Sequence, residues 1–159
     1  MRIKAFLISD KNIERDSYLW NMIGSLLMAF QSVIMLMILT RTLGLVDAGI
    51  FTIAYANANL FLNIGKYGMR YFQVSDVKGQ FTFADYRMSR VLTSIAMIMV
   101  SVGYVMYSAA AKGYTMEKTQ IIIWMCLLKT IDAVEDIYHG LYQNKARLDV
   151  ASKAMTLRL

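Results

Sequence analysis

The stretch "SYLWNMIGSLLMAFQSVIMLMILT", residues 17–40, contains no charged residue. A helix rises about 1.5 Å per residue, so roughly 20 residues cross a hydrocarbon core of about 30 Å. The stretch is longer than the apolar part of a signal peptide, which holds roughly 7–15 residues, and the segment before it carries Asp10, Glu14 and Asp16. We therefore expect a membrane-spanning helix here and not a cleaved leader.

Two further uncharged runs follow, over residues 48–65 and 91–111. The chain of 159 residues is 57% hydrophobic and 18% charged, and it contains no proline. Soluble domains usually have about 45–50% apolar and about 25% charged residues. The sequence therefore predicts an all-α integral membrane protein with spans at about 17–40, 48–67 and 91–111.

A fourth span, at about 119–142, is harder to recognise because its second half is charged. Orientation decides the question, since basic residues mark the cytoplasmic side of membrane proteins. If this segment crosses, only Arg41, Lys112 and Lys118 lie on the outer side, and nearly all other basic residues lie on the inner side. We therefore expect four transmembrane helices and a multi-pass protein with both termini cytoplasmic.

These spans divide the chain into three parts. Residues 1–16 are expected to form an amphipathic cytoplasmic arm, residues 17–145 the four-helix membrane region, and residues 146–159 a cytoplasmic tail. The polar connection over residues 74–90 is expected to be cytoplasmic and to enter a short interfacial helix through Asp85.

Polar residues form stripes on three of the expected helices, because positions three, four or seven apart share one helix face. The second span carries the candidate substrate-binding residues Asn59, Asn63, Lys66 and Arg70, in line with Thr52. The fourth span carries a candidate coupling or structural charge stripe, namely Lys129, Asp132, Glu135, Asp136 and His139. The first span has the milder stripe Asn21, Ser25 and Ser32. Together the stripes indicate helices that line a hydrated cavity.

Simpler interpretations of the same residues stay open. Membrane asparagines often only join helices through hydrogen bonds, and Asn57, which lies off the stripe, is expected to contact a neighbouring helix. Lys66 and Arg70 also fit cytoplasmic anchors whose side chains reach the headgroups. Lys129 with Asp132 or Glu135 also fits an internal ion pair of structural importance.

Enzyme chemistry is not indicated. With one histidine and one cysteine, Cys126, the chain offers neither an intramolecular disulfide nor a multi-histidine metal site. It has no glycine-rich phosphate loop and no nucleophile elbow. We expect no enzymatic activity, no cofactor and no metal. The net charge of +6 is spread between apolar spans, so no nucleic acid is expected as a partner.

The segment "LTRTLGLVDAGIFTIAYANANLFLNIGKYGMRYFQVSD", residues 39–76, resembles bacterial polysaccharide-exporter proteins. These are lipid-linked oligosaccharide flippases of the multidrug/oligosaccharidyl-lipid/polysaccharide exporter superfamily, often labelled lipopolysaccharide biosynthesis proteins. The segment "DIYHGLYQNKARLD", residues 136–149, is similar to the end of their fourth helix. The residues that carry the resemblance at the first turn are Arg41, Leu43, Gly44, Ala48, Gly49 and Phe51.

The resemblance implies part of the N-terminal lobe of a larger helical flippase, that is, an N-terminal fragment. It implies movement of undecaprenyl-linked oligosaccharide across the bacterial cytoplasmic membrane for surface polysaccharide biosynthesis. The implied partners are that lipid-linked oligosaccharide and membrane lipids, and other polysaccharide-assembly membrane proteins are candidates. Amides suit sugar hydroxyls, and Lys66 and Arg70 suit a pyrophosphate headgroup.

Two other functions remain open. One is a complete small four-helix multidrug-type transporter that acts as an oligomer, although such transporters depend on a carboxylate in the first span, and residues 17–40 have none. The other is a non-transporting membrane scaffold, in which every stripe only joins helices. As a fragment, the chain is not expected to flip a lipid-linked glycan alone, because alternating access generally needs two repeats that rock about one site.

Overall fold

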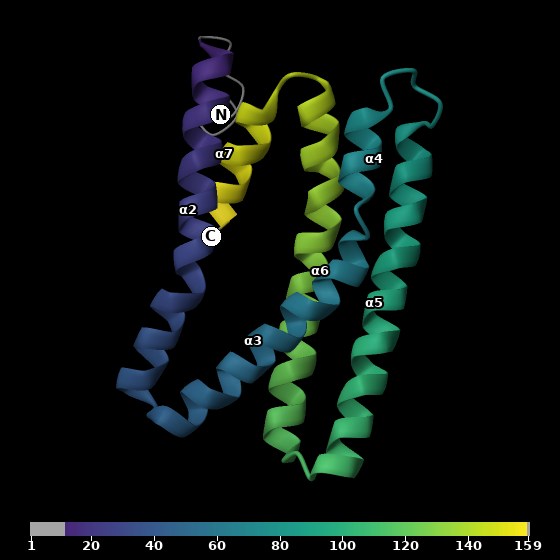
Figure 1. The fold of residues 1–159 in the computed structure, drawn as a ribbon. Helices are drawn as coiled ribbons and strands as arrows, with labels where there is room; N and C mark the ends of the chain where they lie inside the picture. The colour runs from purple at the N-terminus through teal and green to yellow at the C-terminus, as the bar shows by residue number, and fades with distance from the viewer. Residues whose placement is uncertain (1–11, 159) are drawn as a thin grey trace, which may run out of the picture.

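The computed structural model describes residues 12–158, and every regular element in that range is a helix (Figure 1). This confirms the all-α prediction for the described part of the chain. Residues 1–11 of the expected amphipathic arm lie outside the described residues. The elements are α2 (Ile13–Thr42), α3 (Leu45–Lys66), α4 (Met69–Ser75), α5 (Phe83–Lys112), α6 (Met116–Asn144) and α7 (Leu148–Arg158).

Three of these helical stretches are long and apolar enough to cross a membrane. They are Ile13–Thr42, Leu45–Ser75 taken through the junction of α3 and α4, and Phe83–Lys112. Their length and composition are compatible with a membrane protein. The fourth expected span corresponds to α6, which has 29 residues but is not among the three.

Helices α3, α5 and α6 form the packed part of the molecule (Figure 1). Their core contains Ala54, Ala58 and Phe61 from α3, and the fully buried Met97 and Ile122 face them from α5 and α6. Small residues such as alanine let membrane helices approach closely. The bundle therefore has a closely packed apolar core. The charged residues of α6 from Lys129 onward follow its core residues along the same helix.

Helix α2 stands apart from α5 and α6 in Figure 1 and meets α3 at one end and α7 at the other. Gly24 is its one buried residue, and a Cβ there would lie 2.5 Å from the terminal methyl carbon of Met155 in α7. Large apolar side chains such as Phe30 and Val33 are more than half exposed. A surface of this kind is stable in lipid, where apolar side chains need no protein cover.

The C-terminal segment, expected as a tail, contains helix α7, which packs on α2 and α6. Asp149, Ser152 and Lys153 are buried in this contact. The backbone N–H of Asp149 donates to the hydroxyl of Ser17 at 3.0 Å. The end of the chain is thus part of the folded unit.

Helix α5 begins at Phe83, well before the expected residue 91. Thr82 and Asp85 form a capping box, in which the Thr82 hydroxyl accepts from the Asp85 N–H and the Asp85 carboxylate accepts from the Thr82 N–H. Such a box satisfies helix donors that otherwise lack partners. Asp85 therefore does begin a helix, but that helix is the long α5 itself and not the short interfacial helix that was expected before residue 91.

Helices α3 and α4 are separated by Tyr67 and Gly68, whose φ angles of 41° and 64° lie in the left-handed region. The carbonyl of Gly65 in the last turn of α3 accepts hydrogen bonds from Arg90 and from Thr93, both on α5. Carbonyls in a last helical turn lack intrahelical donors, so α5 supplies them here. The expected continuous polar helix from Thr52 to Arg70 is therefore interrupted before Arg70.

Candidate functional site

Polar residues from five helices surround a pocket of about 170 Å³, which we call the polar seam. Most of its lining residues belong to α2, α6 and α7, and Lys66 and Arg70 join them from the two sides of the junction of α3 and α4. Its lining residues are Asn21, Ser25, Met28, Lys66, Arg70, Asp132, Glu135, Asp136, His139, Met155 and Arg158. The structure thus brings together residues from all three stripes that the sequence pattern indicated.

A second pocket, of about 600 Å³, adjoins the polar seam, and we call it the cation pocket. Its lining residues are Asn63, Lys66, Gly68, Arg70, Tyr71, Val74, Ser75, Asp136 and Gln143. Lys66, Arg70 and Asp136 line both pockets. These three residues therefore lie at the boundary between the two pockets.

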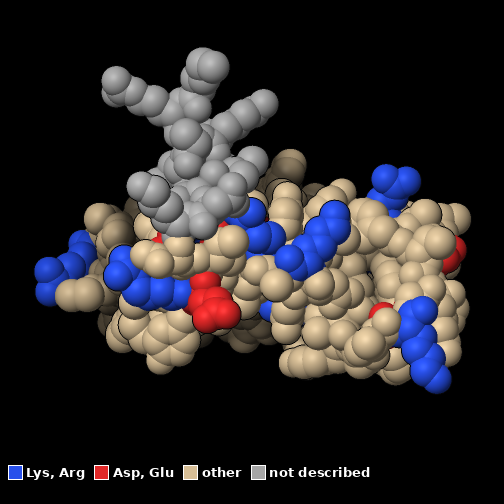
Figure 2. All heavy atoms as spheres, turned by 90° about the horizontal axis from the view of Figure 1, so that it is seen from above, with Lys and Arg blue, Asp and Glu red and all other residues tan. Residues whose placement is uncertain are grey.

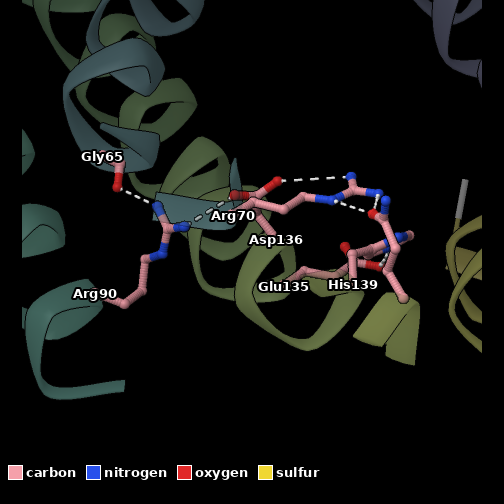
Figure 3. Close-up of polar contacts among 7 residues, drawn as sticks. Gly65, Arg70, Arg90, Glu135, Asp136 and His139 are labelled. Atoms are coloured by element: carbon pink, nitrogen blue, oxygen red, sulfur yellow. Dashed lines mark hydrogen bonds and ion pairs between the residues drawn. The ribbon is translucent and has the colours of Figure 1, made fainter. Parts of the chain in front are cut away.

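Asp136 lies between two arginines from different helices (Figure 3). A guanidinium nitrogen of Arg90 donates to Asp136 Oδ2 at 2.9 Å, whereas Arg70 Nη1 lies 4.0 Å from Asp136 Oδ1. Arg90 is 1% exposed, and its side chain also reaches the Gly65 carbonyl. The short ion pair of Asp136 is thus the one with the buried Arg90. The long ion pair is the one with Arg70, which lines both pockets.

Arg70 is held from the other side by Gln143 of α6. Its Nε and Nη2 donate to Gln143 Oε1 at 3.2 and 2.8 Å. A guanidinium has five N–H donors, so these contacts and the long approach to Asp136 leave donors for a further acceptor. Arg70 is therefore held in position while some of its N–H donors have no partner among the described residues.

Helix α6 carries a second charge network. Lys129 Nζ lies 2.9 Å from Asp132 Oδ2, and Arg158 Nη1 lies 2.6 Å from Asp132 Oδ1. Arg158 Nε also contacts Glu135 Oε2 at 2.9 Å, and His139 Nε2 lies 3.7 Å from Glu135 Oε1. Buried charges are stable only when paired and hydrogen-bonded. Within the described residues, the acids of this stripe all have basic neighbours, and the pair of Lys129 with Asp132 is present.

Lys66 differs from its neighbours. Among the described residues it has no hydrogen bond or ion pair, although it is half-buried at the boundary of both pockets. An ammonium in such a position has three donors available for an anion. Together with Arg70, it gives the cation pocket its positive side.

The asparagines of α3 contribute less than the sequence pattern indicated. Asn63 lines the cation pocket but donates to the carbonyl of Asn59, and Asn59 lines neither pocket. Asn57 was expected to contact a neighbouring helix. Its hydrogen bond instead goes to the carbonyl of Ile53 in its own helix, at 2.8 Å. Thr52 likewise bonds within α3.

Sequence reasoning missed two residues of the site. Arg90 lies in the connection that the sequence predicts over residues 74–90, and Arg158 lies in the predicted tail, so neither was a candidate site residue. Both pair with acids of α6 that lie 46 and 26 positions away, so no local spacing indicated them. In comparisons with protein-family models, with curated proteins and with solved structures, nothing matches this chain.

Proposed function

We propose that the chain is a helical unit of a membrane flippase that moves undecaprenyl-linked oligosaccharide across the bacterial cytoplasmic membrane. The observation that carries this proposal is that Lys66 and Arg70 both line two adjoining polar pockets. Two cations with free donors suit a pyrophosphate, because charge-assisted bonds to phosphate oxygens are among the stronger hydrogen bonds. The amides of Asn63 and Gln143 and the hydroxyls of Tyr71 and Ser75, which line the cation pocket, suit a sugar.

The proposal includes α6 as a fourth membrane span. Helices α5 and α6 have 30 and 29 residues and lie side by side, joined by the short turn around Gly113 (Figure 1). If α5 crosses the bilayer, an antiparallel partner of equal length crosses back. An ionised side chain facing lipid at mid-membrane costs about 2.5–3.5 kcal/mol, and the pairing of Lys129 and Asp132 inside the bundle offsets that cost.

In this arrangement both termini are cytoplasmic. The view down the end of the bundle that holds α4 and α7 shows lysine and arginine spread over it, with few acidic side chains visible (Figure 2). A basic end of this kind favours the cytoplasmic side. The unit is proposed to form part of the N-terminal lobe of a larger flippase, whose remaining helices supply the opposite wall of the cavity.

A binding experiment tests the headgroup site. The purified chain in lipid nanodiscs should bind undecaprenyl-pyrophosphate oligosaccharide more tightly than the same oligosaccharide on an uncharged polyprenol. Lys66→Gln and Arg70→Gln should each weaken that binding roughly tenfold, the loss expected for one charge-assisted hydrogen bond. Lys112→Gln, at the far end of α5, is the matched control and should bind as the wild type does. Equal binding of both lipids, or equal effects of all three variants, would contradict the headgroup site.

A transport experiment separates the three functions. The chain is reconstituted into liposomes with a fluorescent lipid-linked oligosaccharide, and movement between leaflets is followed. Binding without movement supports a unit that needs further helices. Movement by the chain alone would instead support the complete oligomeric transporter, and neither binding nor movement would support the scaffold.

A further inference from the structure

A third cavity lies at the end of the bundle formed by α4, the loop over residues 76–82 and the start of α5. It has a volume of about 830 Å³, the largest of the three pockets described, and we call it the aromatic groove. It shares only Ser75 with the cation pocket. Its walls are the side chains of Tyr67, Met69, Phe72, Val77, Phe81 and Tyr86. It is therefore a separate site with a mainly apolar interior.

Several side chains that line the groove are more than half exposed. Phe72 is 67% exposed, Val77 92% and Phe81 59%, and the neighbouring Tyr71 is 82% exposed. Exposed aromatic side chains beside the ends of membrane helices are typical of the headgroup level of a bilayer. This end of the bundle is thus suited to contact lipid at the depth where the acyl chains join the headgroups.

The loop that forms the rim is held in one conformation. Asp76 accepts from the backbone N–H groups of Gln80 and Phe81 at 2.9 and 3.0 Å and from the hydroxyl of Tyr86 at 2.9 Å. These bonds, led by that of Gln80, lower the pKa of Asp76 below its usual value. Both carboxylate oxygens are therefore occupied within the loop, and the groove is preformed.

Two charges at the rim remain available for a ligand. Lys78 lines the groove and has no hydrogen bond or ion pair among the described residues. Asp85 uses only Oδ2 in its bonds to Thr82. A headgroup that carries both a phosphate and a primary ammonium complements this pair, the phosphate facing Lys78 and the ammonium facing Asp85.

We propose that the aromatic groove binds one phospholipid with a primary-amine headgroup, its headgroup between Lys78 and Asp85 and an acyl chain against Phe72 and Phe81. The mixed charge of the rim selects this headgroup over a purely anionic one, which Asp76 and Asp85 repel. It also selects against a quaternary ammonium, which has no N–H to donate to Asp85. The groove thus holds a lipid of the leaflet that surrounds the α4 end of the bundle.

Native mass spectrometry of the detergent-purified chain tests this site. Phosphatidylethanolamine, phosphatidylcholine and phosphatidylglycerol with identical acyl chains are added separately, and retained lipid is counted. We expect one phosphatidylethanolamine to be retained preferentially, and Lys78→Gln to reduce its retention about fivefold, the effect of one exposed charge pair. Phe72→Ser should reduce retention of all three lipids. Tyr107→Ser, which removes an exposed aromatic of α5 outside the groove, should leave retention unchanged.

A second measurement locates the lipid without relying on variants. A phosphatidylethanolamine with a photoreactive acyl chain is cross-linked to the wild-type chain, and the adducts are mapped by peptide mass. Adducts concentrated within residues 67–89 support the groove. Adducts spread evenly over the apolar helices, equal retention of the three lipids, or unchanged retention in Lys78→Gln would each overturn the proposal.

Discussion

Arg90 of α5 donates through one guanidinium nitrogen to the carbonyl of Gly65 in α3 and through the other to the carboxylate of Asp136 in α6. One buried side chain therefore joins the three helices of the packed bundle. It fixes the end of α3 just before Lys66 and balances the charge of Asp136. In doing so it leaves Arg70, on the other side of Asp136, able to bind another acceptor.

Arg90→Gln is expected to destabilise the chain strongly, because it leaves Asp136 without its close partner. Loss of one member of a buried ion pair typically costs about 3–5 kcal/mol. Arg90→Lys should recover little, since a single ammonium lacks the planar fork that serves two acceptors at once. Thermal unfolding in detergent measures both. Arg87→Gln, one turn away on the exposed face of α5, is the control, and equal losses at positions 87 and 90 would contradict this role of Arg90.

The pair of Lys129 and Asp132 should show energetic coupling. Asp132→Asn removes the acid from two bases, Lys129 and Arg158, and is expected to destabilise more than Lys129→Leu, after which Arg158 still faces Asp132. The double variant should lose less stability than the sum of the two single losses, by about 0.5–3 kcal/mol. Unfolding midpoints of the four proteins complete the cycle. Strictly additive losses would mean that the contact contributes nothing.

The proposed orientation predicts which exposed positions react from outside a cell. In a Cys126→Ala background, Glu117→Cys at the start of α6 should react with an impermeant thiol reagent in intact cells. Lys145→Cys, just after the end of α6, should react only after the membrane is opened. The reverse pattern would invert the topology. Reaction of both positions from one side would instead show that α6 does not cross.

The loop of the aromatic groove should lose stability in acid. The pKa of Asp76 is lower in the folded chain than its usual value of 3.8, so its stabilising effect is complete above that value and disappears as the pH falls through the folded pKa. We expect the unfolding midpoint of the wild type to fall over this range more than that of Asp76→Asn, which has no carboxylate to protonate at this position. Parallel curves for the two proteins would show that Asp76 does not contribute.

The helices that are compatible with a membrane were predictable because the length of an uncharged run can be read from one continuous stretch of sequence. The stripes were predictable for a similar reason, since residues three or four apart share a face whatever surrounds the helix. The same rule indicated a pair of Lys129 with Asp132 or Glu135, and the structure has the pair with Asp132. The rule also indicated that Lys66 and Arg70 lie near each other, although the break at Tyr67 and Gly68 places Arg70 in a different helix.

The remaining features depend on contacts between distant segments. Arg90 and Arg158 carry no local mark that distinguishes them from other basic residues near helix ends, and their partners lie on α6. One face of α7 is buried against α2, where Gly24 leaves room for Met155, and no pattern within residues 146–158 reveals this contact. The early start of α5 is different. Thr82 and Asp85 have the spacing of a capping box, which is a local signal, but the charged residues up to Arg90 favoured a start at residue 91.

Gly65 has a consequence for how this chain tolerates sequence change. A Cβ at that position would lie 2.7 Å from the sulfur of Met97 and 3.1 Å from the Cβ of Ala133, whereas Gly49 and Gly103 have nothing within 4 Å. In a library that samples all residues at each glycine, position 65 should accept almost no replacement, while positions 49 and 103 should accept many. A methyl group at position 65 would force the side chains of Met97 and Ala133 to shift beside the turn that carries Lys66, so sequence change is restricted at a glycine that lines none of the three pockets.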